Sequence, residues 1–394
     1  MEKNKTKEFF FYIAQKVYLL GASNYWSEDL KLPKSFYKIH DNLFLITDFI
    51  IILFIGSEWL ALFTQKNLTY KQSGDLFVFA CSHPILHLYS FFMKFNKDKI
   101  SEVLLHLTIN LKKSFNDHDV EERMIRRSKI YTMIFVIIAC STLLSFGVDA
   151  LLHGRVADGT FTTVITAWPD VEDRSFGAGL VRIVIYIIWW YFVIRLICVF
   201  WVIIPVTILL SHQFKNLTSY FYSLSEIFHG DESQDEKERK YEEAFKLGIQ
   251  WHADTLRCTR LCQNAFYFVY SGQILLNVSV IILLVVQLVM SERTVTSILA
   301  NLILFASMVV GTGCLMWNAG DVTVEASKLP TAMFQSGWHN CRAQASRRVR
   351  PLVVIAMLHS QKAVQLHCLG IIEMSYESYI SIIKMSYSVV SVLY

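Results

Sequence analysis

The sequence has few charged residues and few prolines for its length. Only 18% of its 394 residues are charged and six are proline, whereas 54% are hydrophobic. A soluble domain of this size carries about 25% charged residues. The composition therefore excludes an ordinary soluble protein and indicates a membrane protein.

Motifs typical of enzymes are also missing. There is no phosphate-binding glycine loop, nucleophile elbow or His-Glu metal signature, so we expect neither an enzyme nor a cofactor. Cys258 and Cys262 are four residues apart without a further His or Cys at ligand spacing, so no metal site is predicted. No secretory signal or internal repeat is visible, and the missing repeat argues against a transporter. A nucleic-acid partner is not expected.

Seven stretches are long and apolar enough to cross a lipid bilayer, which takes roughly 20 mostly apolar residues. They span 42–63, 74–95, 130–152, 181–211, 266–290, 296–317 and 369–394. The second is the weakest, because His83 and Pro84 interrupt it. No Pro/Gly-rich linker divides the chain. We therefore predict an all-α, polytopic membrane protein with seven transmembrane helices in one domain.

Lysine and arginine are distributed unevenly between the connections. They gather before the first segment and in every second connection after it. The remaining connections carry only Lys66, Lys71, Arg155, Arg174 and Arg293. Since cytoplasmic flanks accumulate positive charge, the N-terminus is predicted to be cytoplasmic and the C-terminus extracellular. We then expect the last helix to be the final crossing and to end at the outer surface.

This orientation makes predictions for the connections. The predicted outer loops contain no cysteine, and Asn67 is the one glycosylation sequon among four that falls outside. The cytoplasmic parts are 212–265 and 318–368. Within them we expect a solvated loop at the charged run 229–243 and a helix under the membrane within 329–364.

The last segment carries a polar stripe. Glu377, Ser381, Lys384, Ser388 and Ser391 are spaced by four, three, four and three residues, which places them on one helix face. One interpretation is a water-facing pore surface, closed at its outer end by Val389, Val392 and Leu393. The other is a polar seam between packed helices. The periodicity alone favours neither.

Segments two to four carry the components of a small apolar pocket with a few hydroxyl groups, which suits a volatile, weakly polar ligand. The candidates are Phe79, His83, Leu86, Thr142, Ser145, Phe146, Tyr186 and the pair Trp189-Trp190, of which we select Trp190. Ordinary packing or lipid-facing aromatic residues would give the same pattern. For the buried-looking Arg195 we favour a structural role, and we place Asp149 at the water boundary.

Several stretches resemble one known family, the insect odorant receptors. "IIKMSYSVVSVLY" is similar to the family's terminal pattern, and "FQSGWHNCRAQASRRVRPLVVIAMLHSQKAV" is similar to its motif between segments six and seven. "AWPD" at 167–170 and "WHADTLRCTRL", which contains His252, also resemble family stretches. The resemblance covers the whole chain and is strongest from Trp251 onward, with a pattern similar to that of moth or butterfly members.

The resemblance implies a channel. Members of this family assemble as tetrameric, non-selective cation channels with a shared co-receptor, Orco, in the plasma membrane of olfactory neuron dendrites. It implies an odorant pocket in the outer half of segments two, three, four and six, and to this pocket we assign Phe305 and Met308 of segment six. It also implies that the last helix lines the pore, with Val392 near the gate, and that the cytoplasmic parts anchor the subunits.

Two other chemoreceptor classes have similar architectures. A G-protein-coupled receptor requires an extracellular N-terminus, opposite to the charge distribution, and usually has a cysteine at the top of segment three, which this chain lacks. Gustatory-type receptors share the inverted architecture but end in a different terminal motif.

Overall fold

The computed structural model describes residues 4–113, 115–155, 159–290 and 295–392. Over these residues the chain is helical apart from short connections and one hairpin, formed by β1 (His367–Cys368) and β2 (Ile372–Glu373). Six of the described helices are long and apolar enough to cross a membrane. They are α2 (Lys34–Thr64), α3 (Tyr70–Phe95), α5 (His118–His153), α6 (Phe176–Ser223), α7 (Gln234–Met290) and α8 (Val295–Ala326). Together with the last helix, α11 (Tyr376–Val392), they confirm the predicted all-α, seven-helix fold.

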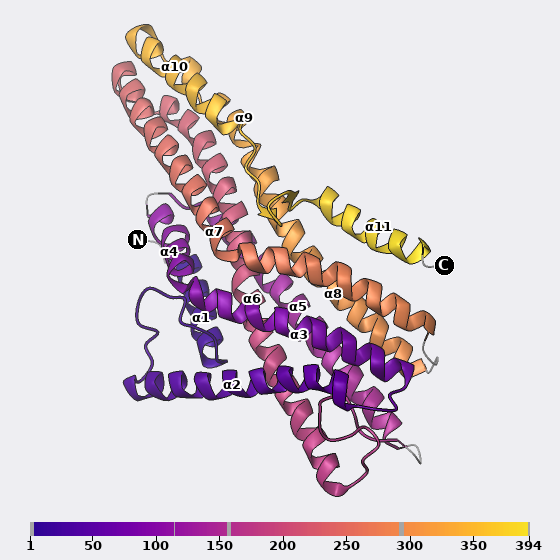
Figure 1. Ribbon diagram of the computed structural model, residues 1–394. Coiled ribbons are helices and arrows are strands. Elements are labelled where there is room, and N and C mark those ends of the chain that lie inside the picture. Colours follow the sequence, from indigo (N-terminus) through magenta and orange to yellow (C-terminus); the bar gives the residue numbers. More distant parts are fainter. Residues whose placement is uncertain (1–3, 114, 156–158, 291–294, 393–394) are drawn as a thin grey trace.

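Two helices extend far beyond any membrane. α6 has 48 residues and α7 has 57. At 1.5 Å per residue they are about 72 and 86 Å long, more than twice the ~30 Å of a hydrocarbon core. The C-terminal half of α6 and the N-terminal half of α7 form an elongated extension with α9 (Leu329–Phe334) and α10 (Ala343–Ser360) (Figure 1). We call this part the distal extension.

The predicted loop at 229–243 is largely wrong, because α7 already begins at Gln234. Acidic side chains in the first turns of α7 have partners in α10 and in the residue directly before it. Glu238 Oε1 accepts a hydrogen bond from the backbone N–H of Arg342 at 2.8 Å, and Arg348 Nε pairs with Glu242 Oε2 at 3.1 Å. These contacts between segments about 100 residues apart stabilise a helix that the local charge pattern does not indicate.

Shorter helices complete the fold. α1 (Lys5–Leu19) and α4 (Lys97–Thr108) pack beside the long helices. Three 3₁₀ turns lie at Asn110–Lys112, Leu224–His229 and Trp338–Asn340. The buried carboxylate of Glu121, at the start of α5, accepts hydrogen bonds from the backbone and hydroxyl of Thr6. This contact holds α1 against α5.

At the other end of the bundle, the connection between α5 and α6 folds over the end of α2. Gln65 Nε2 donates to the carbonyls of Thr166 at 2.8 Å and Pro169 at 3.0 Å. Arg182 of α6 donates to the carbonyls of Asp170 and Asp173 at 2.6 and 2.8 Å. The "AWPD" stretch is thus held in place by side chains from two helices.

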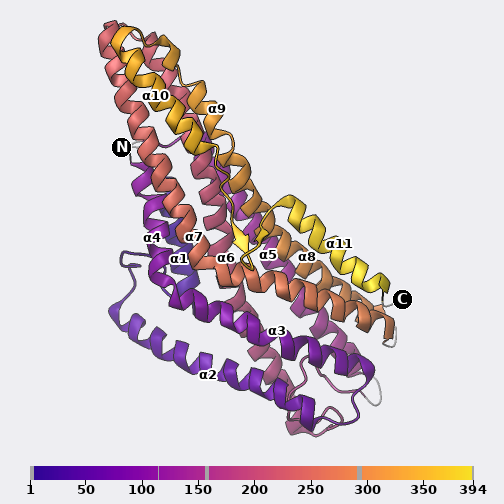
Figure 2. The ribbon, with the colours of Figure 1, turned by 45° about the horizontal axis from the view of Figure 1, so that its top comes forward.

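The last helix lies along α7 and α8, on the side of the bundle opposite α2 (Figures 1 and 2). The hairpin before it is fixed to α7, because Gln263 exchanges two hydrogen bonds with the backbone of His367, at 2.7 and 2.8 Å. α8 has Gly313 and Gly320 where α11 approaches, and a Cβ at Gly313 would lie 3.3 Å from the Tyr379 ring. These glycines permit the close contact between the two helices.

Candidate functional site

A cavity of about 110 Å³ lies among α3, α5, α6, α7 and α8. One water molecule needs only ~10–15 Å³ by this measure, so the cavity has space for a small organic molecule. Its lining is almost entirely apolar. Aromatic rings contribute much of the wall, namely Phe79, Phe135, Trp189, Phe192 and Phe200.

The structure brings together about half of the predicted ligand-binding residues. Phe79, His83, Leu86, Thr142 and Met308 line the cavity. Ser145, Phe146, Tyr186, Trp190 and Phe305 do not. Phe146 packs behind the wall against Phe79 and Trp189, with ring centroids 5.4 and 5.8 Å apart.

The tryptophan that reaches the cavity is Trp189 and not the selected Trp190. Consecutive helical side chains point about 100° apart, so one position decides which indole faces inward. Trp190 packs instead against Tyr186, whose hydroxyl donates to the carbonyl of Leu143 at 3.0 Å. Sequence reasoning also missed Gln273 and Ser307, which line the cavity from α7 and α8.

Two polar side chains of the cavity wall, Trp189 and His83, form a buried hydrogen-bonded chain with Glu58, which lies behind the wall. Trp189 Nε1 donates a hydrogen bond to His83 Nε2 at 3.1 Å, and His83 Nδ1 lies 2.7 and 2.9 Å from the two carboxylate oxygens of Glu58. Glu58 has no exposed surface and His83 is 3% exposed. Because an indole N–H can only donate, the neutral imidazole must carry its proton on Nδ1, facing Glu58.

Glu58 was not among the predicted residues. A lone carboxylate inside the apolar stretch "ILFIGSEWLALF" is the signal that could have identified it, since ionisable groups within membrane helices are costly and need partners. The histidine that interrupts segment two is that partner. Together the two side chains join α2 to α3.

Two other charged groups have structural partners. Arg195 is 4% exposed; its Nη1 pairs with Asp48 Oδ1 at 2.8 Å, and its guanidinium lies 4.5 Å from the centre of the Phe44 ring. Asp149 pairs with Lys71 of α3. Both arrangements connect neighbouring helices, and neither residue lines the cavity.

The polar stripe of α11 faces away from the other helices of the chain. Glu377, Ser381, Lys384 and Ser388 are exposed. On the opposite face Tyr379 and Ile382 are buried. The side chains of Ser391, Val389 and Val392, and the whole of Leu393, lie outside the described part of the chain.

The buried face of α11 connects it to the cavity. Tyr379 Oη donates a hydrogen bond to the carbonyl of Val309 at 3.1 Å, and its ring packs edge-on against Trp317. Val309 lies between Met308 and Val310, which both line the cavity. A displacement of this part of α8 would therefore be transmitted directly to α11.

The comparisons with known proteins agree with this architecture. The family model described as "7tm Odorant receptor" matches residues 77–387, well over half of the chain. The chain belongs to the seven-transmembrane odorant receptor family. No curated protein sequence matches this odorant receptor.

Solved structures with the same fold include the insect olfactory receptor OR5 from Machilis hrabei. Its structure has a TM-score of 0.81 and 11% sequence identity, and the match covers 98% of this chain and 97% of that chain. A second structure of OR5, in complex with eugenol, has a TM-score of 0.80 and 11% identity, with 100% and 99% coverage. The odorant receptor described here is thus a multi-pass membrane protein with the architecture of these receptors.

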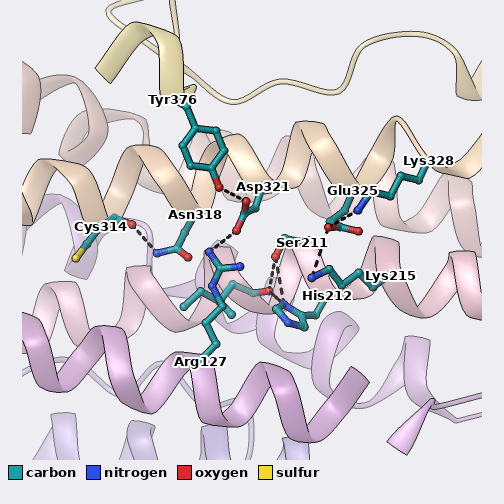
Figure 3. Close-up of polar contacts among 11 residues, drawn as sticks. Arg127, Ser211, His212, Lys215, Cys314, Asn318, Asp321, Glu325, Lys328 and Tyr376 are labelled. Atoms are coloured by element: carbon teal, nitrogen blue, oxygen red, sulfur yellow. Dashed lines mark hydrogen bonds and ion pairs between the residues drawn. The ribbon is translucent and has the colours of Figure 1, made fainter. Parts of the chain in front are cut away.

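In this odorant receptor a second contact joins α11 to the bundle, at the start of the helix (Figure 3). Asp321 of α8 accepts a hydrogen bond from the Tyr376 hydroxyl and pairs with Arg127 of α5. One turn further along α8, Glu325 pairs with Lys328 at 2.9 Å and with Lys215 of α6 at 3.5 Å. Acidic residues on one face of α8 therefore tie three other helices together.

The glycosylation sequons differ in accessibility. Asn67 is exposed in the short connection between α2 and α3, whereas Asn216 and Asn277 are at most 1% exposed, and Asn4 caps α1. Of the four, Asn67 is the one best placed to carry a glycan if its loop is extracellular. Within the described ranges, no group of three or more His, Cys, Asp or Glu residues could hold a metal ion.

Proposed function

We propose that this odorant receptor is the odour-tuning subunit of a ligand-gated, non-selective cation channel, assembled as a heterotetramer with the co-receptor Orco. The observation that carries the proposal is the connection between the cavity and the last helix. Met308 and Val310 line the cavity, and the carbonyl of Val309 between them accepts the hydrogen bond from Tyr379 of α11. A small volatile molecule in the cavity would therefore contact α8 directly beside Val309, the residue that is hydrogen-bonded to the proposed pore helix.

Gating follows from differential binding. An odorant shifts the channel toward the open state only if it binds that state more tightly than the closed state. We expect the occupied cavity to move α8, and α11 to follow through Tyr379 and Tyr376. The pore surface would be formed by Ser381, Lys384 and Ser388, which face away from the chain's own helices. The apolar end with Val389, Val392 and Leu393 would open by wetting.

The remaining assignments follow from charge and from the family. The uneven distribution of Lys and Arg supports a cytoplasmic N-terminus and an extracellular C-terminus. In that orientation the distal extension, within 212–265 and 318–368, lies in the cytosol, where it would hold the subunits together. The plasma membrane of olfactory dendrites is the proposed location. The complex of the related OR5 with eugenol supports a small organic ligand.

The test is whole-cell current during odorant pulses, in cells that express this chain alone, Orco alone, or both. We expect fast currents in the doubly transfected cells that persist when G proteins are blocked. Odorant responses of this chain alone that G-protein blockade abolishes would instead assign it to the G-protein-coupled class. Responses only to involatile tastants would favour a gustatory-type receptor. Surface labelling of the chain must accompany each recording, because a receptor that does not reach the cell surface gives no current whatever its function.

A further inference from the structure

We infer that the cavity selects small molecules with an apolar body and one hydroxyl group, that is, alcohols or phenols, over aldehyde and ether analogues of the same size. This inference rests on the proposed function and specifies its ligand class. The evidence is the acceptor to which each polar group of the cavity wall donates its hydrogen.

The hydroxyl groups of the wall donate to their own helices. Thr142 Oγ1 donates to the carbonyl of Ile138 at 3.1 Å, and Ser307 Oγ donates to the carbonyl of Leu304 at 2.7 Å. Ser82 Oγ lies 3.5 Å from the carbonyl of Phe79, in the same relationship. A hydroxyl oxygen has two lone pairs besides its hydrogen. These groups can therefore accept a hydrogen bond from a ligand without giving up the one they donate.

The stronger donors of the wall are also engaged. The Trp189 indole N–H is directed at His83 Nε2, and the Nδ1 hydrogen of the neutral His83 is directed at the Glu58 carboxylate. Since all three side chains are buried, redirecting either hydrogen to a ligand would leave a buried acceptor without a partner. This chain of side chains therefore offers no donor to the cavity.

Gln273 does not discriminate between the ligand classes. Its Nε2 lies 3.4 Å from Thr312 Oγ1, so one of its two amide hydrogens is directed to α8. An amide offers both a donor and an acceptor. It can serve a hydroxyl or a carbonyl ligand equally, and the difference between them is left to the hydroxyl groups of Ser82, Thr142 and Ser307.

The consequence is an asymmetry between ligands of equal size. An alcohol donates its hydrogen to the hydroxyl oxygen of Ser82, Thr142 or Ser307 and breaks no hydrogen bond of the protein. An aldehyde or ether can only accept, so beyond the hydrogen bond that Gln273 offers to either ligand class, it must draw a hydroxyl hydrogen away from a helix carbonyl. We expect this difference to favour the alcohol by about three- to tenfold in half-maximal concentration, the range of one ordinary hydrogen bond.

The test compares matched odorants of equal chain length (a primary alcohol, its aldehyde and its methyl ether) on cells that express the receptor with Orco. We expect the alcohol to be the most potent of each set. Thr142→Val and Ser307→Ala should each lower the potency of the alcohol by a larger factor than the potencies of the aldehyde and the ether, and so reduce the alcohol preference. Thr142→Ser keeps the acceptor and should retain the preference. Ser145→Ala is the matched control, because Ser145 lies on the same helix and donates to the Thr142 carbonyl, but does not line the cavity.

Surface labelling of each variant, together with a wild-type current toward a direct agonist of Orco, shows that the variant is folded and delivered. Equal or greater potency of the aldehydes or ethers on the wild-type receptor would overturn the inference. So would an alcohol preference that survives the combined variant Ser82→Ala, Thr142→Val and Ser307→Ala. Silence toward every odorant, with the receptor present at the surface and Orco active toward a direct agonist, would overturn the proposed function itself and the ligand class with it.

Discussion

The Tyr376 hydroxyl donates a hydrogen bond to the same Asp321 carboxylate that pairs with Arg127. One carboxylate of α8 thus holds the first turn of α11 and the N-terminal part of α5. Both α5 and α8 continue into the wall of the cavity. The start of the proposed pore helix is therefore fixed to two of the helices that an odorant would contact.

We expect Tyr376→Phe to raise the odorant concentration for half-maximal current by about tenfold, since it removes a hydrogen bond to a charged group worth ~1.5–3 kcal/mol. Asp321→Asn should have a similar or larger effect, and the double variant should fall short of the sum, because both changes break one interaction. The measurement is the odorant dose–response with Orco. Tyr222→Phe, at an exposed tyrosine of α6, is the matched control. An unchanged dose–response for Tyr376→Phe at normal surface levels would refute this coupling.

The Glu58–His83 pair should dominate the stability of the cavity wall. Glu58→Leu removes the carboxylate that accepts the His83 Nδ1 hydrogen and leaves this buried donor unpaired, and a hydrogen bond to a charged group contributes ~1.5–3 kcal/mol. Trp189→Phe removes one neutral hydrogen bond and should cost only about 1 kcal/mol. The order of melting temperatures in detergent is then wild type, Trp189→Phe, Glu58→Leu.

The triple variant Glu58→Leu, His83→Phe and Trp189→Phe should recover part of the lost melting temperature, since replacing all three side chains by apolar groups leaves none of their hydrogen-bonding atoms unpaired. Trp190→Phe provides the control for the loss of an indole at the adjacent position. A triple variant that melts no higher than Glu58→Leu would show that these side chains contribute by packing rather than by their hydrogen bonds.

A glycan at Asn67 would report the orientation of the chain. We expect glycosidase treatment to increase the gel mobility of the wild-type receptor and to leave Asn67→Gln unchanged. Asn216→Gln and Asn277→Gln should behave as the wild type, because both side chains are buried. A glycosidase shift that persists in Asn67→Gln would contradict both the site and the predicted orientation.

The free energy of unfolding should increase with pH because of Lys112, which lies in the 3₁₀ turn before α5. Burial lowers the pKa of this amine to about 8, although Glu121 and Asp117 act in the opposite direction. Below that pKa the folded protein bears the full cost of a buried ammonium group, and the cost disappears as the pH rises toward the ~10.4 of an exposed lysine.

Lys112→Met should therefore raise the melting temperature at pH 7, by about 2 °C or more, and the gain should shrink by pH 9.5. Lys113→Met is the control at the neighbouring exposed lysine. A gain for Lys112→Met that is the same at both pH values would argue against the buried charge as its cause.

The long helices could be predicted because their signal is local. A run of apolar residues long enough to cross a bilayer identifies itself, and so does the polar spacing of α11. Three of the five cavity helices, α3, α5 and α6, were indicated for the same reason, since Phe79, His83 and Thr142 lie on apolar segments with isolated polar groups, whereas α8 came from the family resemblance and α7 was missed. Such runs do not specify which side of each helix faces the cavity. Trp189 and Trp190 are the same residue type on the same helix, and only the side of the helix on which each lies decides that Trp189 lines the cavity.

Pairings between distant segments could not be predicted. Glu58 finds His83, Asp321 finds Tyr376, and the charged residues at the start of α7 find the backbone and side chains before and within α10. Each partner is chosen by how the helices pack, and a single sequence contains no direct record of that packing. The helical start of α7 is the clearest case, because its local composition is typical of a loop.

α7 runs from the tip of the distal extension to the cavity (Figure 1). Gln273 at the cavity and Gln234 at the tip of the distal extension are 39 residues apart, or about 58 Å along the helix axis. Substitutions at such separations contribute additively to the free energy. The side chains of the cavity can therefore be exchanged without altering the tip, and receptors with different odorant preferences could keep one and the same distal extension.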